Sequence, residues 1–522
     1  MSRPLQIVIM LCLGLRSGLG FTSLISAAKA RTRISALQSD SIAEHAYPID
    51  PKEELGRSSV AERLGEKSGP TVWQQMAVLA AQTGALNLGQ GYPDWSPPEF
   101  VRKAGAQVLA PDAPPGVHQY TRTAGHPRLV NLLAKRYSKH FGRELDGLKE
   151  VSVTVGATQA LYLCLQTLLH PGDEVLVLEP YFDLYIGQIK ASGGVPVAVP
   201  LSLDMSEGWR LDTAALERAI TRDTRVIIVN TPHNPTGTIF SRAELEAIAD
   251  IAEKHDLLVI SDEVYKFIRF DQRWIASEGL EQKPEDDQTL EHVHFAELSG
   301  MWERTMTVSS AGKTFSVTGW QVGWIVAPEQ YTSTVHKILP LVQFCAATPL
   351  QEALSIALEE AEKPFNDYPN YYRFLQDVYA EKAATLAKAL RSAGFTLGDG
   401  WGGGGLFLMA EVTSMMHLVP PEYFQEDWTP SEGQAAVNTV LNGQKRVSND
   451  LAFVRFLADQ WDILAIPASA FFYSDDAEYE SFGALEKRAF IRFAFCKKDE
   501  TLKEASEKLK AFGDSVKEAA DK

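Results

Sequence analysis

Between residues 151 and 309 the chain alternates β-branched runs with longer apolar runs, and this alternation limits its fold more than any other feature. Runs typical of strands occupy residues 151–155, 174–179, 225–230, 257–262 and 305–309, and helical patterns occupy 156–169 and 243–254. Such alternation predicts a mostly parallel sheet with helices on both faces, an α/β fold. In sheets of this kind, ligands bind at the carboxyl ends of the strands.

One lysine follows the last of these predicted strands. Lys313 lies in the run SAGKTFSVTG (residues 310–319), among small and hydroxylated residues. Small residues let the backbone come close to a ligand. Burial would lower the pKa of this amine and leave it nucleophilic. Lys313 is therefore a candidate Schiff-base amine, and the alternative is a solvated loop lysine.

Two charged residues lie in strand-like apolar runs. Asp262 ends the run 257–262, and Arg492 lies within residues 491–495. Buried charges need partners of opposite sign. A pyridinium nitrogen would suit Asp262, and a substrate carboxylate would suit Arg492. The alternative is a structural salt bridge between these two residues or with their neighbours.

Three turns carry groups suited to a flat, phosphorylated ligand. Residues 156–158 open a helix after a strand, where free N–H groups and the helix dipole favour a phosphate. Phe182 follows the strand 174–179 and would stack on a ring, with a core aromatic as the alternative. Two X-Pro steps in residues 230–237 (NTPHNPTG) predict a rigid turn that presents the Asn234 amide.

Together these motifs resemble those of the class I/II pyridoxal-phosphate aminotransferases of fold type I. Within that family they are most similar to the kynurenine–oxoglutarate aminotransferase group, also known as glutamine transaminase K and cysteine-conjugate β-lyase. The resemblance extends from about residue 71 to the end and rests on residues 88–94, 119–123, 179–182, 230–237, 261–265, 300–304, 309–324 and 491–495. It implies a large domain with a mostly parallel seven-stranded sheet between helices, and a smaller α+β domain.

The resemblance also implies catalytic roles for three residues. Lys313 would form an aldimine with pyridoxal 5′-phosphate and move the substrate's α-proton. Asp262 would keep the pyridine nitrogen protonated, so that the ring acts as an electron sink. Tyr265 would hydrogen-bond the ring oxygen.

Further residues are implied to hold the cofactor or the substrate. The implied cofactor contacts are Asn234 at the ring oxygen, Phe182 on the ring face, and Ala157, Thr158 and Ser310 at the phosphate. Tyr120 would reach the phosphate of the neighbouring subunit, which implies a homodimer with active sites at the interface. The implied substrate-binding residues are Gly91, Asn234 and Arg492.

One position departs from the family pattern. Where the family has a lysine or arginine eight residues after the Schiff-base lysine, this chain has Gln321. The phosphate would then lack one cation, and weaker cofactor retention is expected. Residues 271–290 and 416–446 look like insertions.

The function implied is transamination in ping-pong order. An L-amino acid (aromatic, kynurenine, glutamine or sulfur-containing) would give its amino group to a 2-oxo acid such as 2-oxoglutarate or pyruvate. Alternatives are β-elimination from cysteine conjugates and a non-catalytic, cofactor-binding regulator. The formal charge of −17 disfavours a nucleic-acid partner. We expect no stable membrane association and no metal among the site residues.

The first 39 residues hold five basic residues and no acid, with an apolar run at 5–15. We expect residues 1–45 to be a bipartite presequence for a plastid, with a mitochondrion or the secretory route as alternatives. The predicted domains are an arm with part of the small domain (46–115), the large cofactor-binding domain (116–345) and the C-terminal small domain (346–522). Four scattered cysteines suggest neither a disulfide framework nor a zinc site.

Overall fold

A computed structural model describes residues 71–206, 208–270, 291–398, 402–430, 447–473 and 488–520. The predicted presequence, the predicted insertion at 271–290 and the second half of that at 416–446 lie outside these ranges. Among the described helices, none is both long enough and apolar enough to cross a membrane.

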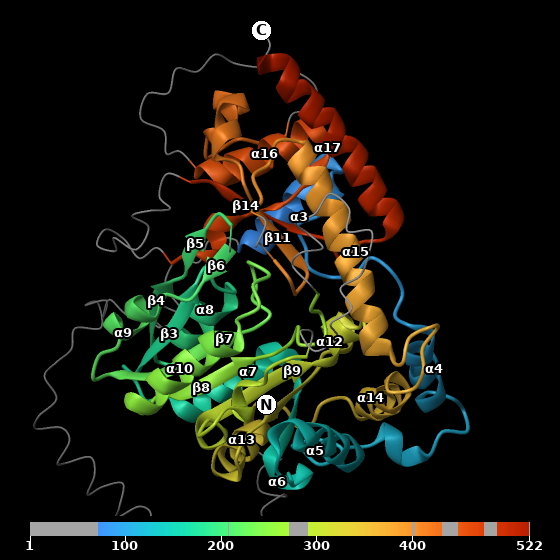
Figure 1. The fold of residues 1–522 in the computed structure, drawn as a ribbon. Coiled ribbons are helices and arrows are strands. Elements are labelled where there is room, and N and C mark those ends of the chain that lie inside the picture. The colour runs from blue at the N-terminus through green and yellow to red at the C-terminus, as the bar shows by residue number, and fades with distance from the viewer. Residues whose placement is uncertain are drawn as a thin grey trace, which may run out of the picture. The chain divides into compact units, whose positions relative to one another are not determined.

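A seven-stranded sheet organises the larger part of the fold (Figure 1). In spatial order its strands are β2 (Val151–Val155), β10 (Val322–Val326), β9 (Thr305–Ser310), β8 (Leu258–Asp262), β7 (Thr224–Asn230), β3 (Glu174–Glu179) and β4 (Val195–Pro200). Strand β10 is antiparallel to both of its neighbours, and the other adjacent pairs are parallel. The predicted mostly parallel seven-stranded sheet is therefore confirmed, although β4 and β10 were not foreseen.

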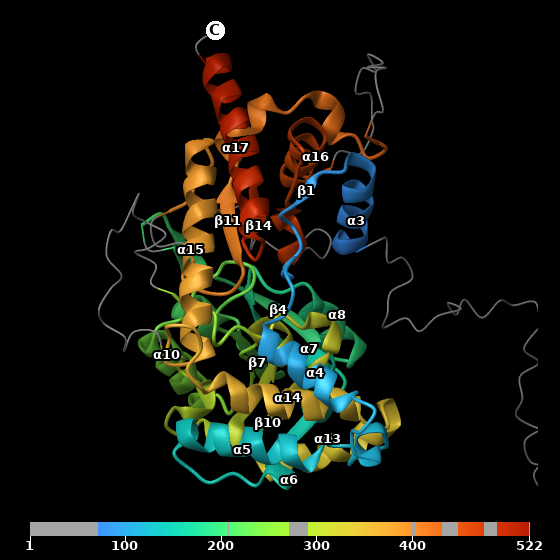
Figure 2. The same ribbon diagram turned by 90° about the vertical axis from the view of Figure 1, so that its right-hand side faces the viewer.

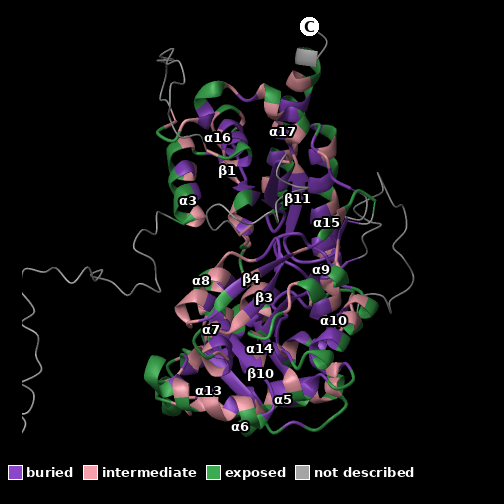
Figure 3. Ribbon diagram, turned by 90° about the vertical axis from the view of Figure 1, so that its left-hand side faces the viewer, coloured by how far each residue is buried: buried purple, intermediate pink, exposed green. Residues whose placement is uncertain are grey.

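The sheet is buried on both faces, which explains the β-branched runs of the sequence. Alternate residues of β7 belong to different apolar clusters: Ile227 and Val229 to one, Val226 and Ile228 to the other. Successive side chains of a strand point to opposite faces, so each face has its own core. Figure 3 shows the buried residues running through the strands. The helices around this sheet include α5 (Pro127–Phe141), α6 (Gly147–Glu150), α7 (Gly156–Leu168), α8 (Leu184–Ala191), α9 (Thr213–Arg218), α10 (Arg242–Lys254), α13 (Glu329–Val342) and α14 (Thr348–Ala361).

A second group of elements contains the C-terminal strands. Strands β11 (Phe407–Glu411), β14 (Phe490–Ala494) and β13 (Ile466–Pro467) form a three-stranded sheet. Helices α15 (Tyr371–Ser392) and α17 (Asp499–Ala520) lie side by side (Figure 2). The segment after residue 70 joins this group, because α3 (Val72–Thr83) contacts α16 (Asn449–Trp461) and β1 (Leu86–Asn87) pairs with β12 (Ile463–Leu464). The remaining elements include α4 (Glu99–Val108), α12 (Ala311–Thr314) and the hairpin of β5 (Ser202–Asp204) and β6 (Gly208–Arg210).

Two glycines let strand β10 approach the start of helix α7. Gly156, at the strand-to-helix turn, has a φ of +70°, and a Cβ on Gly323 would lie 2.4 Å from the carbonyl carbon of Gly156. The Gly156 N–H donates to the Gln321 carbonyl at 2.8 Å. This hydrogen bond holds Gln321, the residue before β10, next to the N-terminus of helix α7.

Candidate active site

A cavity of about 350 Å³ lies where strands β7, β8 and β9 end. Of the twelve site residues predicted from the sequence, eleven line it: Gly91, Ala157, Thr158, Phe182, Asn234, Asp262, Tyr265, Ser310, Lys313, Gln321 and Arg492. They come from segments as far apart in the chain as Gly91 and Arg492. The structure thus brings these side chains together, as expected for the carboxyl edge of a parallel sheet.

Lys313 lies in α12, immediately after β9. Its ammonium group donates to the Gly91 carbonyl oxygen at 2.8 Å. The pKa of Lys313 is lowered to about 8, chiefly by burial; Cys496 and Asp262 raise it, and the guanidinium of Arg492 lowers it. About a tenth of this amine is therefore unprotonated at pH 7, and this form is the nucleophile.

Asp262 ends β8 with a nearly fully buried side chain. The Tyr185 hydroxyl donates to its Oδ2 at 2.6 Å, and the Val264 N–H to its Oδ1 at 3.3 Å. Burial raises the pKa of Asp262 to about 6, against the lowering effect of the Tyr185 hydrogen bond. Within the described ranges this carboxylate has no salt-bridge partner, so a ring N–H⁺ in the cavity would supply the missing charge.

Arg492 lies in β14 and is fully buried. It donates to Asn234 Oδ1 at 2.9 Å and to the Gly89 carbonyl at 3.1 Å. Burial lowers the pKa of Arg492 to about 10. No salt bridge to it occurs in the described part of the chain, and its Nε has no hydrogen-bond partner there. The alternative of a structural salt bridge between Arg492 and Asp262 is therefore wrong. A substrate carboxylate would supply the guanidinium with a partner of opposite charge.

Aromatic rings surround the Arg492 guanidinium. Its central carbon lies 3.8 Å from the ring centroid of Phe407, 4.6 Å from that of Phe471 and 5.2 Å from that of Trp73. These rings exclude water and strengthen a charge–charge contact made there. Asn234, which accepts from Arg492, keeps its Nδ2 donor for a ligand oxygen.

The opposite end of the cavity is polar but carries little positive charge. Ala157 and Thr158 form the first turn of α7, and Ser310 ends β9. Gln321, in a left-handed conformation with φ of 50°, donates through Nε2 to the Thr318 carbonyl. Among the described lining residues, the only lysine and arginine are Lys313 and Arg492. A phosphate here would be held by amides and hydroxyls.

Tyr120 is the one predicted residue that the structure does not place at the cavity. Its side chain is 78% exposed and its ring centroid lies 4.4 Å from that of Phe344, itself 63% exposed. An exposed aromatic pair of this kind suits a contact with a second molecule. Its role at a neighbouring subunit's phosphate stays a prediction.

The lining residues that were not predicted from the sequence include Trp73, Tyr185, Asn230 and Phe407. Tyr185 lies only three residues after the predicted Phe182, and in the structure their rings meet edge to face at 5.6 Å. Asn230 fixes the predicted turn, since its Oδ1 accepts from the Asn234 N–H at 2.7 Å. Trp73 and Phe407 reach the cavity through packing between distant elements, for which the sequence carries no local signal.

The donor set fits pyridoxal phosphate. A buried acid that lacks a cation, a lysine of lowered pKa and a helix N-terminus match the ring nitrogen, the aldehyde and the phosphate of that cofactor. When bound, the cofactor supplies an aldehyde carbon that accepts an amino group and a ring that takes up an electron pair.

Comparisons with known proteins define the family. The family model described as aminotransferase class I and II matches residues 83–509. The chain belongs to the class I and II aminotransferases. It is a pyridoxal-phosphate-dependent transaminase, which confirms the predicted family, enzyme class and cofactor.

Its relatives include kynurenine–oxoglutarate transaminases. The protein of that name from Dictyostelium discoideum is 37% identical over 455 residues, 84% of this chain and 94% of the relative. Kynurenine–oxoglutarate transaminase 3 of Homo sapiens is 36% identical over 450 residues, 84% of this chain and 88% of the relative. A solved structure, N-succinyldiaminopimelate aminotransferase from Mycobacterium tuberculosis, is similar with a TM-score of 0.69 and 32% identity, and the match covers 87% of this chain and all of that one.

We predict that the Lys313 amine of the cofactor-free protein titrates near pH 8. A group whose pKa burial lowers loses its proton earlier as pH rises, so acetylation of Lys313 should reach half its maximum near pH 8. A lysine side chain with an unperturbed pKa titrates at about pH 10. Competitive labelling with trace acetic anhydride, followed by peptide mass spectrometry, measures the midpoint for Lys313. A midpoint at about pH 10 would contradict the prediction.

We predict that Gln321→Lys tightens cofactor binding. The added ammonium group would neutralise part of the phosphate charge at the start of α7, and a charge-assisted contact is worth about 1.5–3 kcal/mol, or roughly 10- to 150-fold in dissociation constant. Equilibrium dialysis of the cofactor measures the change, with Gln330→Lys on α13 as a matched control. Unchanged retention in both variants would show that the amides and hydroxyls suffice.

Proposed function

We propose that the enzyme moves the amino group of an L-amino acid with a large, uncharged side chain to a 2-oxo acid such as 2-oxoglutarate or pyruvate. The donor class comprises kynurenine, other aromatic amino acids, glutamine and sulfur-containing amino acids. The chain is similar to relatives named kynurenine–oxoglutarate transaminase, which supports this class.

The observation that carries the proposal is the surroundings of Arg492. If this guanidinium pairs with the α-carboxylate, no second arginine is left among the described lining residues to bind a charged side chain. The one lysine among them is Lys313. Three aromatic rings lie within 5.2 Å of the guanidinium carbon. An apolar or aromatic donor side chain packs well there, whereas the β-carboxylate of aspartate would lie beside these rings without a cationic partner.

The chain's own residues then have distinct tasks. Arg492 and Asn234 orient the substrate carboxylate, which fixes the Cα–H bond relative to the cofactor ring. Lys313, once its amine is free, takes the proton from Cα, and its lowered pKa suits a base near neutral pH. Asp262, supported by the Tyr185 hydroxyl, holds the proton on the ring nitrogen.

We also propose that the enzyme is a homodimer in which Tyr120 completes the partner's phosphate site. Three large apolar side chains are unusually exposed: Tyr120 at 78%, Leu341 at 82% and Phe344 at 63%. Apolar residues gathered on a surface mark an interaction site. Tyr120 brings a hydroxyl donor to a phosphate end that has no arginine among its described residues.

The donor proposal is tested by single-turnover reactions of the cofactor-loaded enzyme. Each amino acid is mixed with the enzyme without an acceptor, and the loss of the cofactor's visible absorbance is followed. Kynurenine, phenylalanine and glutamine should react faster than aspartate. Aspartate as the fastest donor would overturn the proposal.

The same assay tests Arg492. Arg492→Lys keeps one charge but loses the bidentate contact, so the apparent dissociation constant of the donor should rise by about 10- to 150-fold, the equivalent of about 1.5–3 kcal/mol. Arg222→Lys, at a highly exposed arginine, should leave it unchanged. An unchanged constant in Arg492→Lys would remove the residue from substrate binding.

The homodimer is tested by the double variant Leu341→Glu, Phe344→Glu. Charges on this surface should yield monomers by light scattering, and the monomers should lose cofactor on dialysis because Tyr120 no longer reaches a partner. Val195→Glu, on the exposed edge strand β4, should stay dimeric. A wild-type enzyme that is monomeric yet retains its cofactor would contradict the proposal.

A further inference from the structure

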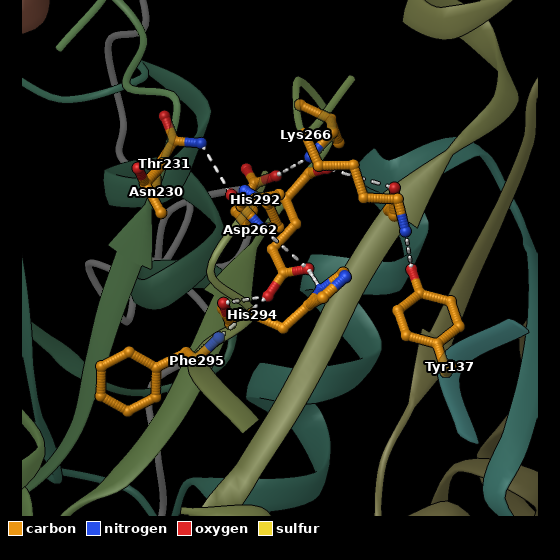
Figure 4. A network of polar contacts seen from close by, with 12 residues as sticks. Tyr137, Asn230, Thr231, Asp262, Lys266, His292, His294 and Phe295 are labelled. Carbon is orange, nitrogen blue, oxygen red and sulfur yellow. Dashed lines mark hydrogen bonds and ion pairs between the residues drawn. The ribbon is translucent and has the colours of Figure 1, made fainter. Parts of the chain in front are cut away.

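A second polar cluster lies beside the active site, at the residue that follows Asp262. Glu263 is fully buried and meets two histidines, His292 and His294, from a segment about 30 residues further along (Figure 4). Asp262 lines the substrate cavity, whereas Glu263 is directed to the histidines. Glu263 follows the last residue of β8 and is not among the residues that line the substrate cavity, so the two sites are separate.

The geometry of the cluster is that of a two-histidine, one-carboxylate site. The His294 Nδ1 contacts Glu263 Oε2, and the His292 Nε2 lies 3.2 Å from the same oxygen. The three ligand atoms all lie within 4.8 Å of one another. Ligand atoms placed about 2.1 Å from a tetrahedral zinc ion are roughly 3.4 Å apart, so small ring rotations suffice to bind one.

The carboxylate is already oriented by its neighbours. Its other oxygen, Oε1, accepts from the Ser261 hydroxyl at 2.9 Å and from the Phe295 N–H at 3.3 Å. Oε2 is left for the two imidazoles. Hydrogen bonds that fix a ligating carboxylate in this way are usual around protein-bound metals.

Two observations indicate that the cluster lacks a cation. The side chain of His292 is only 8% exposed, yet neither of its ring nitrogens, including the Nε2 that faces Glu263, has a hydrogen-bond partner among the described residues. Lys266, the nearest lysine in the chain, donates to the Tyr137 hydroxyl at 2.6 Å and forms no described salt bridge with Glu263. A fully buried carboxylate is costly without a positive partner.

Space for a further ligand adjoins the cluster. A cavity of about 450 Å³ is lined by both histidines and by His140, whose ring centroid lies 4.8 Å from that of His294. A water molecule in this cavity can complete a four-coordinate site, as in zinc sites with three protein ligands. Neutral imidazoles and a carboxylate are the ligands that zinc-like ions accept.

We propose that Glu263, His292 and His294 bind one divalent transition-metal ion of the zinc type. The ion joins the end of strand β8 to the segment that begins 3₁₀ turn η4 (Phe295–Glu297). Its role is structural, because the ligands do not line the substrate cavity. An ion that binds only the folded protein stabilises it by mass action.

The test measures zinc on the cofactor-loaded enzyme. After equilibrium dialysis against zinc chloride and gel filtration, mass spectrometry of the metal should find one zinc per chain. His292→Gln and His294→Gln should each lose it. His417→Gln, at an exposed histidine, should keep it. Cofactor absorbance and the donor reaction serve as separate readouts, so failure of the metal site is distinct from failure of the proposed function.

A second measurement follows the thermal stability of the wild-type enzyme. A chelator should lower the thermal midpoint of the wild-type enzyme, and added zinc should restore it, with no such response in His294→Gln. Wild-type enzyme that holds no more zinc than His294→Gln, or whose midpoint ignores both chelator and zinc, overturns the proposal.

Discussion

Two buried charges that have no described ion-pair partner define this molecule. Asp262 and Arg492 are held by neutral donors and acceptors, Tyr185 and Asn234 among them, and not by each other. An unpaired buried ion costs several kcal/mol, which the two apolar cores of the large sheet must offset. In the roles proposed above, Asp262 pairs with an aromatic N–H⁺ and Arg492 with a carboxylate, and this pairing would recover part of that cost. The fold therefore favours the binding of ligands that carry the opposite charges, because it leaves both groups without an ion-pair partner.

The residues that could be predicted from the sequence are those whose local pattern conflicts with burial. Asp262 and Arg492 stand out as charges in apolar runs, and Lys313 as a lysine between small residues. Trp73 and Phe407 have no such signal, because aromatic residues occur in protein cores as well as at cavity walls. Their position depends on helix α3 and strand β11, which lie more than 300 residues apart in the chain, about three-fifths of its length.

Strand β10 illustrates a second limit. Its first three residues, 322–324, were included in the motif 309–324 and so were not read as a strand, yet β10 forms the antiparallel member of the sheet. The histidines beside Glu263 show the opposite case: no spacing rule relates positions 263, 292 and 294, so only the folded chain brings them together.

Helix α3 determines at which residue a shortened recombinant chain should begin. The family match begins at residue 83, the last residue of that helix. Trp73, ten residues upstream, donates to Asp183 Oδ2 at 2.6 Å and shields the guanidinium of Arg492. A recombinant chain that begins at residue 83 would expose the Arg492 guanidinium to solvent, whereas one that begins at Thr71 retains both the indole and the capping box of the helix.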